Sequence, residues 1–263
     1  MYFALAASLI APVRMIAPVG RETVNELKAV IGDRPIDASL VEVLDAPTYR
    51  WQAHQQLGRN IDLGSRDSIY DVWNPAPPAS FDGWAFVGSM RPDRQAQLMG
   101  GLACAEVLAA DAMLSYVHVQ SAEARQVLRR ARWYFCNEEE FAALDGREPE
   151  AFRRRWELDG LVIKAGARGV TAYTEGRNVH VPALPSRPVV DTTGAGDSVA
   201  AGMMARWLVT GGGTEGLREA LVWGVACASI TISDIGVRAI RAATRKDLDE
   251  RVEEVKERLR LAS

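Results

Sequence analysis

The chain has 263 residues, of which 48% are hydrophobic, and a formal net charge of −3. That length and apolar content can bury a substantial core, in one large domain or in two small ones. The small negative charge, with basic and acidic residues interspersed, gives no electrostatic support for nucleic-acid binding.

Cysteine and histidine are too few and too scattered to indicate a metal site or a disulfide framework. The three cysteines lack metal-ligand spacing, and reduced thiols in apolar surroundings favour a cytoplasmic protein. The three histidines lie far apart, so no zinc site is expected. No apolar run reaches the roughly 18 residues of a membrane span, so no membrane partner is expected.

Strand-like and helical segments alternate along the chain, which is typical of an α/β sheet covered on both faces. The first segment, residues 1–10, predicts a buried helix. Strands are expected at residues 13–16, Trp84–Val87, 106–109, 133–136 and 161–164. Further helices are expected at residues 21–31, Pro92–Gly101, 121–131, 141–156, 198–209, 214–233 and 246–261.

Residues 40–70 have a different pattern, in which polar and apolar residues alternate at period two. The alternation covers residues 41–43, 48–54 and 61–63, with a turn at 58–60. It predicts a half-exposed antiparallel sheet that projects from the main body. We therefore expect a single domain over residues 1–263, with these strands within about 40–72.

The most informative segment is Asp191-Thr192-Thr193-Gly194-Ala195-Gly196-Asp197, which joins an extended run to an apolar helix. Glycines let a ligand approach the backbone, and the first N–H groups of a helix lack intrahelical partners, so the turn predicts an anion site. Asp197 beside it could accept a proton from an attacking hydroxyl. A purely structural interpretation is a tight turn with Thr192 or Thr193 as the helix cap.

This string, followed by Ser198-Val199-Ala200-Ala201-Gly202, resembles the C-terminal signature of the PfkB carbohydrate kinases, the ribokinase-like family. The resemblance implies a ribokinase-like α/β fold, with a mostly parallel sheet flanked by helices and a small β lid formed by the alternating segment. It implies transfer of a phosphoryl group from ATP to a hydroxymethyl group of a sugar or related small polyol. Mg²⁺ is the implied metal cofactor, and a monovalent cation is a further cofactor that the resemblance allows. By position, Asp197 is the catalytic base and contacts the substrate, and Gly194, Ala195 and Gly196 form the anion hole.

A second motif, Asn137-Glu138-Glu139-Glu140, follows the predicted strand at 133–136 directly. As local structure, Asn137 caps a helix and Glu140 completes a capping box. The motif also resembles the Asn-x-x-Glu motif of the PfkB kinases, whose glutamate holds Mg²⁺ through water. Both interpretations stand together, because Mg²⁺ keeps several waters and needs only one or two carboxylates.

The nucleotide site is expected around three further segments. Residues 164–169 resemble the family's Thr-x-Gly-x-x-Gly loop with Lys164 in place of threonine, and Gly166 and Gly169 permit a tight turn beside the phosphates. A simple turn before a hairpin is the alternative. The resemblance also assigns Thr192 to the nucleotide site. It implies that Cys227 and Gly236 belong to the helix and glycine turn that wall the adenine pocket, and a packed helix is the alternative interpretation.

Two residues are assigned to the substrate by position. Asp111 closes an apolar strand where family members often carry a polar residue near the transferred phosphate, although a strand-end turn former explains it equally well. Arg50 lies on the proposed lid beside Trp51, and alternation alone does not decide which of them faces the substrate. In several members of the family two lids pair, so a homodimer through the lid is one expectation.

The family's first strand, with its sugar-gripping aspartate and the Gly-Gly pair after it, has no counterpart in this sequence. Residues 2–8 resemble the helix that follows that pair. We expect either a start assigned too late or a truncated chain, with low stability and activity, because unpaired strand edges would be left open.

Two other functions remain open at this stage. One is a nucleoside kinase of the adenosine-kinase type, and the other is a non-catalytic nucleotide-binding relic of the family. A Rossmann dehydrogenase is not supported, since no Gly-x-Gly-x-x-Gly follows an early strand.

Overall fold

The structure is a computed structural model of the chain, and it describes residues 1–56, 59–184 and 188–261. The chain divides into two compact units. The first unit joins Met1–Asn74 to Leu184–Ser263, and the second unit is Pro75–Ala183. Within the described ranges, no helix is both long and apolar enough to cross a membrane.

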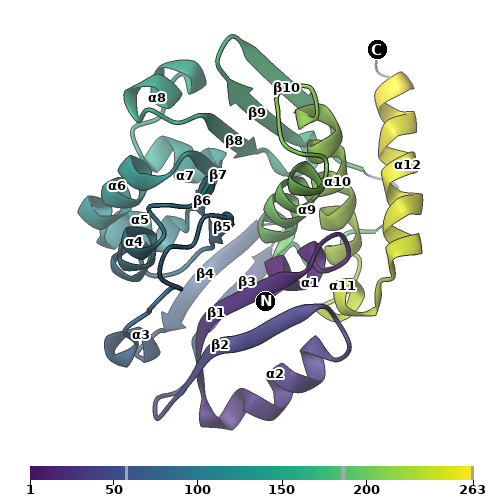
Figure 1. The fold of residues 1–263 in the computed structure, drawn as a ribbon. Coiled ribbons are helices and arrows are strands. Elements are labelled where there is room, and N and C mark those ends of the chain that lie inside the picture. Colours follow the sequence, from purple (N-terminus) through teal and green to yellow (C-terminus); the bar gives the residue numbers. More distant parts are fainter. Residues whose placement is uncertain (57–58, 185–187, 262–263) are drawn as a thin grey trace. The chain divides into compact units, whose positions relative to one another are not determined.

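The second unit is built on a six-stranded sheet in the order β10-β9-β8-β7-β6-β5 (Figure 1). Strands β5 to β8 are parallel, and β9 and β10 are antiparallel additions at one edge. Both β7 and β8 are buried along almost their whole length, as expected for short parallel strands covered by helices. The elements are β5 (Trp84–Val87), α4 (Pro92–Gly101), β6 (Val107–Asp111), α5 (Leu114–Val119), α6 (Ser121–Arg130), β7 (Trp133–Asn137), α7 (Glu138–Ala143), α8 (Pro149–Arg155), β8 (Gly160–Lys164), the 3₁₀ turn η2 (Gly166–Arg168), β9 (Val170–Thr174) and β10 (Arg177–Val181).

The prediction of one helix over residues 141–156 is wrong, because the chain breaks between α7 and α8. Asp145 has a φ of 63° in the left-handed region, where a helix cannot continue. Pro149 then takes the first helical position of α8. Proline lacks the N–H that a helix interior needs, so it begins a new helix instead of extending the old one.

The first unit contains two separate two-stranded sheets and a group of helices (Figure 1). Its elements are α1 (Tyr2–Ala7), β1 (Val13–Gly20), the 3₁₀ turn η1 (Arg21–Thr23), α2 (Val24–Ile31), β2 (Ile36–Leu44), β3 (Arg50–Gln56), β4 (Arg59–Arg66), α3 (Ile69–Val72), α9 (Ala195–Val209), α10 (Leu217–Thr231), α11 (Arg238–Ala242) and α12 (Arg245–Leu261). The expected buried N-terminal helix is confirmed by α1, whose residues 4–7 are all buried.

The expected antiparallel sheet is present, but it is smaller than predicted. Strands β3 and β4 pair antiparallel, as expected for residues 48–54 and 61–63. Residues 41–43 instead belong to β2, which pairs parallel with β1, so their assignment to that sheet is wrong. Helix α2 connects β1 to β2 and provides the crossover that parallel strands require. Gly58 of the predicted turn lies outside the described residues, and Arg59 already belongs to β4.

Helices α9 and α10 approach closely because a glycine lies on each side of their contact. A Cβ atom added to Gly202 would lie 2.6 Å from the carbonyl oxygen of Trp223, and one added to Gly224 would lie 2.6 Å from that of Val199. The buried hydroxyls of Ser198 and Thr231 also hydrogen-bond across the contact at 2.7 Å. The contact therefore fixes α9, whose first residues belong to the signature segment.

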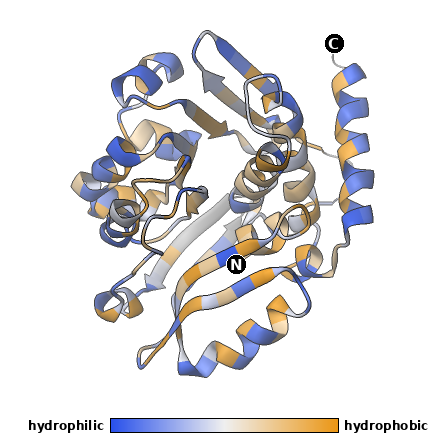
Figure 2. Ribbon diagram, in the orientation of Figure 1, coloured by the Kyte–Doolittle hydropathy of each residue, from blue (hydrophilic) through white to orange (hydrophobic). Residues whose placement is uncertain are grey.

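Helix α12 covers α10 with one apolar face. Its hydrophobic and hydrophilic residues alternate around the helix (Figure 2), and Leu248, Val252 and Val255 are buried. The remaining surface is rich in charged residues, as is typical of an amphipathic helix at the edge of a core.

The glycine contact predicts a stability effect. Gly224→Ala should lower the free energy of unfolding by about 1–3 kcal/mol, because the new methyl group would overlap backbone atoms that cannot move independently. Urea denaturation of this variant and of Gly216→Ala provides the measurement. Gly216 begins α10 with a φ of −76° and has no atom within 3.6 Å of an added Cβ, so its variant should stay within about 0.5 kcal/mol of wild type. Equal stability of the two variants would contradict the close contact.

Candidate functional site

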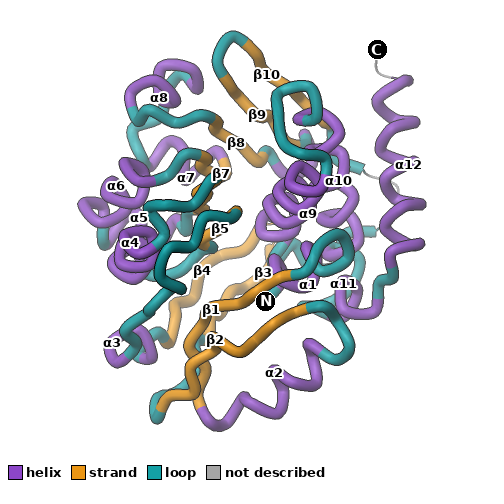
Figure 3. The backbone as a smooth tube through the Cα atoms, viewed as in Figure 1, coloured by secondary structure: helices purple, strands orange, loops and turns teal. Residues whose placement is uncertain are grey.

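In the first unit, the chain enters α9 through a left-handed turn at Gly194, and the segment just before the helix is a loop (Figure 3). Gly194 has a φ of 76° and is the N-cap residue, and no side chain caps the helix. Asp197 lies half-buried in the first helical turn. The alternative that Thr192 or Thr193 is the side-chain cap is therefore wrong.

The residues predicted to form the anion hole, Gly194, Ala195 and Gly196, lie at this helix start, and of their N–H groups only that of Ala195 has an acceptor among the described residues. The N–H of Ala195 donates to the carbonyl oxygen of Thr192 at 3.2 Å. The N–H groups of Gly196 and Asp197 have no acceptor within the described part of the chain. Free N–H donors at the positive end of a 15-residue helix are suited to binding an anion.

Asp191, the first residue of the signature, connects the turn before α9 to the turn at Gly236 by hydrogen bonds. Its carboxylate accepts hydrogen bonds from the N–H of Thr193 and the N–H of Gly236, both at 2.9 Å. Partial burial raises the pKa of Asp191, but these two hydrogen bonds, together with one from the side chain of Thr193, outweigh burial and leave the pKa below its ordinary value. Sequence analysis assigned no role to this residue, although an aspartate two residues before an unpaired N–H is a local signal for such a turn.

Tyr2 is a further residue of this site that the sequence did not reveal. Its ring lies directly against Gly194, since a Cβ atom added to that glycine would be 2.2 Å from both Cγ and Cδ1 of the ring. Burial, followed by the negative charges of Asp191 and Asp197, raises the pKa of Tyr2 to about 12. The phenol is therefore neutral and lies close to both carboxylates.

Cys227 and Gly236 lie in the same unit in different surroundings. Gly236 adopts a φ of 60° in an open turn and donates to Asp191, which is compatible with its predicted place near a ligand. Cys227 is completely buried in α10, where its Sγ faces Gly202, and burial raises its pKa to about 12. This burial argues against a contact between the Cys227 thiol and a nucleotide, and it supports the packed-helix alternative.

Strand β3 shows which face of the small sheet is covered. Arg50, Gln52 and His54 are exposed, whereas Trp51 and Ala53 are partly buried. The Nε1 atom of Trp51 is buried without a hydrogen-bond partner in the described residues. Arg50, the predicted substrate contact, therefore lies on the open face, and Trp51 lies on the covered face.

In the second unit, polar side chains gather where β6, β7 and β8 end. Asp111 at the end of β6 is 2% exposed, and both of its carboxylate oxygens accept hydrogen bonds from the Nζ atom of Lys164 at 2.7 Å. Lys164 ends β8, and the sheet places β7 between these two strands. The ion pair therefore passes over the end of β7. It pairs Asp111, which sequence analysis assigned to the substrate, with Lys164, which it assigned to the nucleotide.

The predicted capping box at the start of α7 is confirmed. The side chain of Asn137 accepts the N–H of Glu140 at 2.8 Å, and the carboxylate of Glu140 accepts the N–H of Asn137 at 2.7 Å. Glu140 is 7% exposed. Burial raises the pKa of Glu140 to about 7, the charge of Lys164 opposes that rise, and the charge of Asp111 adds to it.

The loop after β8 has the tight geometry that its glycines predict, and it leads into the hairpin of β9 and β10. Gly166 has a φ of 56° and is exposed, with open space where a side chain would be. Gly169 has a φ of 101°, and a Cβ there would lie 2.2 Å from the carbonyl oxygen of Val181. Gly169 is thus required for packing, whereas Gly166 leaves backbone open to a ligand.

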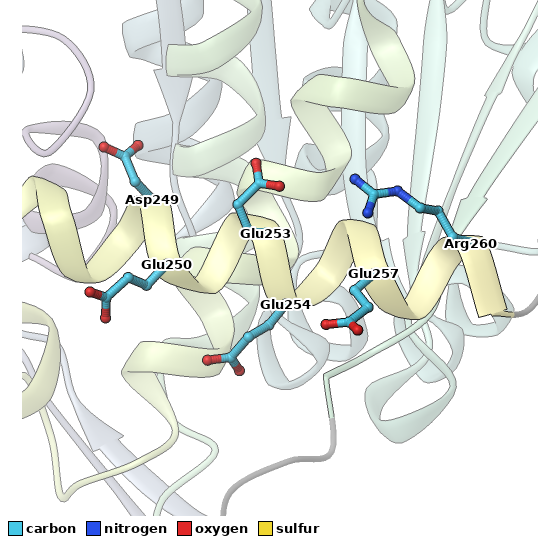
Figure 4. Close-up of a pocket in the computed structure, with 6 residues that line it drawn as sticks. All are labelled: Asp249, Glu250, Glu253, Glu254, Glu257 and Arg260. Atoms are coloured by element: carbon cyan, nitrogen blue, oxygen red, sulfur yellow. The ribbon is translucent and has the colours of Figure 1, made fainter.

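A separate hollow lies along α12 and contains none of the predicted site residues. Its lining is five carboxylates and one guanidinium, which point away from the helix axis on different sides (Figure 4), namely Asp249, Glu250, Glu253, Glu254, Glu257 and Arg260. Among the residues that the structure describes, no group of three His, Cys, Asp or Glu side chains is arranged to hold a metal ion.

Comparison with known sequences gives a family for the chain. The sequence model of the pfkB family carbohydrate kinases matches residues 92–244. A nucleoside kinase of Methanocaldococcus jannaschii is 28% identical over 86 residues, which is 32% of this chain and 28% of that protein. An ATP-dependent ribose-1-phosphate kinase of Halopiger xanaduensis is 34% identical over 121 residues, 45% of this chain and 38% of that protein. A cytidine kinase of Thermococcus kodakarensis is 26% identical over 209 residues, 74% of this chain and 73% of that protein.

Comparison with solved structures identifies the fold as ribokinase-like. The nucleoside kinase of M. jannaschii, described as an archaeal member of the ribokinase family, has a TM-score of 0.79 at 19% identity, covering 96% of this chain and 85% of that chain. A fructokinase of Vibrio cholerae with bound fructose and ADP has a TM-score of 0.73 at 16% identity, covering 95% and 89%. Because the same fold is found in kinases named for nucleosides and for fructose, the fold alone does not select the acceptor.

The buried ion pair predicts a large and asymmetric stability effect. Lys164→Met should lower the free energy of unfolding by about 3–5 kcal/mol at pH 7, because Asp111 would keep a buried charge without its partner. The double variant Lys164→Met with Asp111→Asn should recover most of that loss. Lys256→Met, which breaks an exposed pair with Glu253, should change stability by less than about 1 kcal/mol. Chemical denaturation of the three variants is the measurement, and equal effects of both single variants would contradict the buried pair.

The raised pKa of Glu140 predicts how stability varies with pH. The folded protein holds the Glu140 proton up to about pH 7, whereas the unfolded chain loses it near 4.5. This group therefore stabilises the fold below pH 4.5, and its contribution is lost as the pH rises through 7. The stability difference between wild type and Glu140→Gln should fall over this range in urea titrations at several pH values. Glu139→Gln, at an exposed neighbouring position, should show a constant difference, and a constant difference for Glu140→Gln would refute the shift.

Proposed function

The chain belongs to the pfkB family of carbohydrate kinases and is therefore a phosphotransferase by family, and from this premise we propose that it phosphorylates a ribosyl acceptor with ATP. The acceptor hydroxyl would be the one on a hydroxymethyl group, as sequence analysis expects. The observation that carries the proposal is the start of α9, where two free N–H groups and the carboxylate of Asp197 occupy the same helical turn.

Asp197 would act as the base in this reaction. A carboxylate beside an anion site can accept the proton of a hydroxyl that attacks a phosphoryl group bound there. The N–H groups of Gly196 and Asp197 would then stabilise the phosphoryl oxygens, because they are directed toward the helix start before the reaction begins.

In the proposed reaction ATP would supply the phosphoryl group, and Mg²⁺ would neutralise its phosphates. Glu140 would hold a Mg²⁺ ion through water when its carboxyl group is ionised, since the capping box with Asn137 fixes that group in place. Gly166 leaves open backbone for the nucleotide in the same unit. The ammonium group of Lys164 is held by Asp111, so we propose that Lys164 orders this region instead of binding phosphate.

The ribosyl acceptor is supported by the names of the relatives. The three curated relatives are described as a nucleoside kinase, a ribose-1-phosphate kinase and a cytidine kinase. Their named acceptors share a pentose ring with a free hydroxymethyl group, whereas the base and the anomeric phosphate differ. This comparison moves the proposal away from a general sugar or polyol acceptor and toward the nucleoside alternative.

The acceptor is tested by measuring ADP formation with a panel of compounds. Cytidine, inosine, ribose 1-phosphate, ribose and fructose should be compared at equal concentrations with Mg²⁺-ATP. Turnover with at least one ribosyl compound, at least tenfold above fructose, is the expected result. Turnover with fructose alone would contradict the ribosyl class, and ATP binding with no turnover on any compound would favour a non-catalytic relic.

The proposed role of Asp197 as the base predicts a large loss of activity in the variant Asp197→Asn. The variant should lower kcat at least about a hundredfold, the usual contribution of a general base, while its melting temperature stays near that of wild type. Asp249→Asn, a change of the same kind on the exposed face of α12, is the matched control and should retain full activity. Near-normal turnover by Asp197→Asn on the true acceptor would exclude Asp197 as the base.

A further inference from the structure

The side chain of Tyr2 lies beside two turns of the first unit, the turn at Gly194 that begins α9 and the turn at Gly236. Its ring lies against Gly194, with Cγ and Cδ1 2.2 Å and Cδ2 2.5 Å from the place of an added Cβ. At the other end of the side chain, the hydroxyl oxygen lies 3.9 Å from the place of a Cβ on Gly236. Both glycines have positive φ values, 76° and 60°, so both turns depend on a conformation that other residues rarely adopt.

The two turns are also joined through Asp191, which accepts the N–H groups of Thr193 and Gly236. Asp191 connects the turns by hydrogen bonds, and the Tyr2 ring fills the space in front of Gly194. The ring projects from α1, which packs on α9 and whose residues 4–7 are buried. The Tyr2 hydroxyl has no hydrogen-bond partner among the described residues, so the ring is the part of the side chain that makes the contact.

We propose that Tyr2 is a positioning residue for the anion hole, a role that rests on the proposed function of the α9 start. Its ring holds Gly194 in the left-handed conformation, and this conformation directs the N–H groups of Gly196 and Asp197 toward one point. The hydroxyl remains protonated, so Tyr2 adds no third negative charge beside Asp191 and Asp197.

The hydrogen-exchange rate of one backbone amide, that of Ser198, reports the left-handed conformation of Gly194. The first hydrogen bond of α9 runs from the N–H of Ser198 to the carbonyl oxygen of Gly194 at 2.9 Å, and Ser198 is completely buried. If the Gly194 turn loosens, this hydrogen bond opens and the Ser198 amide exchanges faster with solvent. An amide in the middle of α10, such as that of Val225, reports global opening and serves as the internal reference.

The experiment compares Tyr2→Phe, Tyr2→Ala and Phe3→Ala in the full chain. Tyr2→Phe keeps the ring and should keep kcat and Ser198 exchange within about twofold of wild type. Tyr2→Ala removes the ring and should lower kcat between about tenfold and a hundredfold, the effect of small misplacement of reacting groups, while the acceptor KM changes little. Phe3→Ala removes an aromatic ring of similar exposure at the next position and should leave Ser198 exchange unchanged. If Tyr2→Ala fails to fold, Tyr2→Leu replaces it.

A double-mutant cycle isolates the contact itself. Gly194→Ala alone should nearly abolish turnover, because the new methyl group has both a strained φ and an overlap with the ring. In the Tyr2→Ala background the further loss from Gly194→Ala should be at least fivefold smaller, whereas in the Tyr2→Phe background it should be undiminished.

Wild-type values of both kcat and Ser198 exchange in Tyr2→Ala would overturn the positioning role, and so would faster exchange with an unchanged kcat. If wild type phosphorylates no ribosyl compound, the proposed function fails. Ser198 exchange in Tyr2→Ala would still decide whether the ring holds the Gly194 turn.

Discussion

The left-handed turn at Gly194 is the constraint on which the first unit depends. A side chain at this position would meet both an unfavourable φ and the ring of Tyr2, so the backbone can reverse there only without a Cβ atom. Because glycine supplies no capping side chain, the N–H groups of Gly196 and Asp197 in the first turn of α9 have no acceptor among the described residues. The same turn therefore starts the helix and leaves N–H donors at its positive end, which is the basis of the proposed anion site. The close glycine contact between α9 and α10 then holds this helix end in the core.

In the second unit, charged groups lie at the buried ends of parallel strands. Asp111 would be costly to bury alone, and Lys164 compensates it with two short hydrogen bonds across the end of β7. The two charges compensate each other, and Glu140 is a third buried titratable group at this edge, beside the exposed Glu138 and Glu139. The pKa of Glu140 near 7 follows from burial, and the capping box fixes its position. Ligand sites of open α/β sheets lie at the carboxyl ends of strands, which is where Asp111, Lys164 and Glu140 are found.

Local sequence patterns predicted the features that depend on neighbouring residues. The signature turn, the capping box of Asn137 and Glu140 and the glycine loop after β8 each depend on residues within six positions, and the structure shows the expected local geometry at all three. Pro149, which begins α8, is a local signal for the break between α7 and α8 that the prediction of one helix over 141–156 did not use. Residues 41–43 alternate like an exposed antiparallel strand, and only the preceding helix α2 shows that they follow a crossover.

Long-range contacts could not be predicted in this way. Asp111 and Lys164 are 53 residues apart, and their meeting depends on the order of three strands. Tyr2 and Gly194 meet because α1 packs on α9, which no periodicity in either helix specifies. These contacts change the interpretation of the site, since they give Lys164 and Asp111 an internal partner and add Tyr2 to the helix start. The side-chain partners of a site residue, more than its motif, therefore decide whether it is free to bind a ligand.

The central claim is that the start of α9 binds the phosphoryl group during transfer. A crystal structure of the full chain with ADP, Mg²⁺ and aluminium fluoride, an analogue of the transferring group, tests it most directly. The account predicts fluoride atoms about 2.7–3.1 Å from the backbone nitrogens of Gly196 and Asp197, with the Asp197 carboxylate facing the open side of the analogue. An analogue bound elsewhere, with those two N–H groups facing only water, would contradict it.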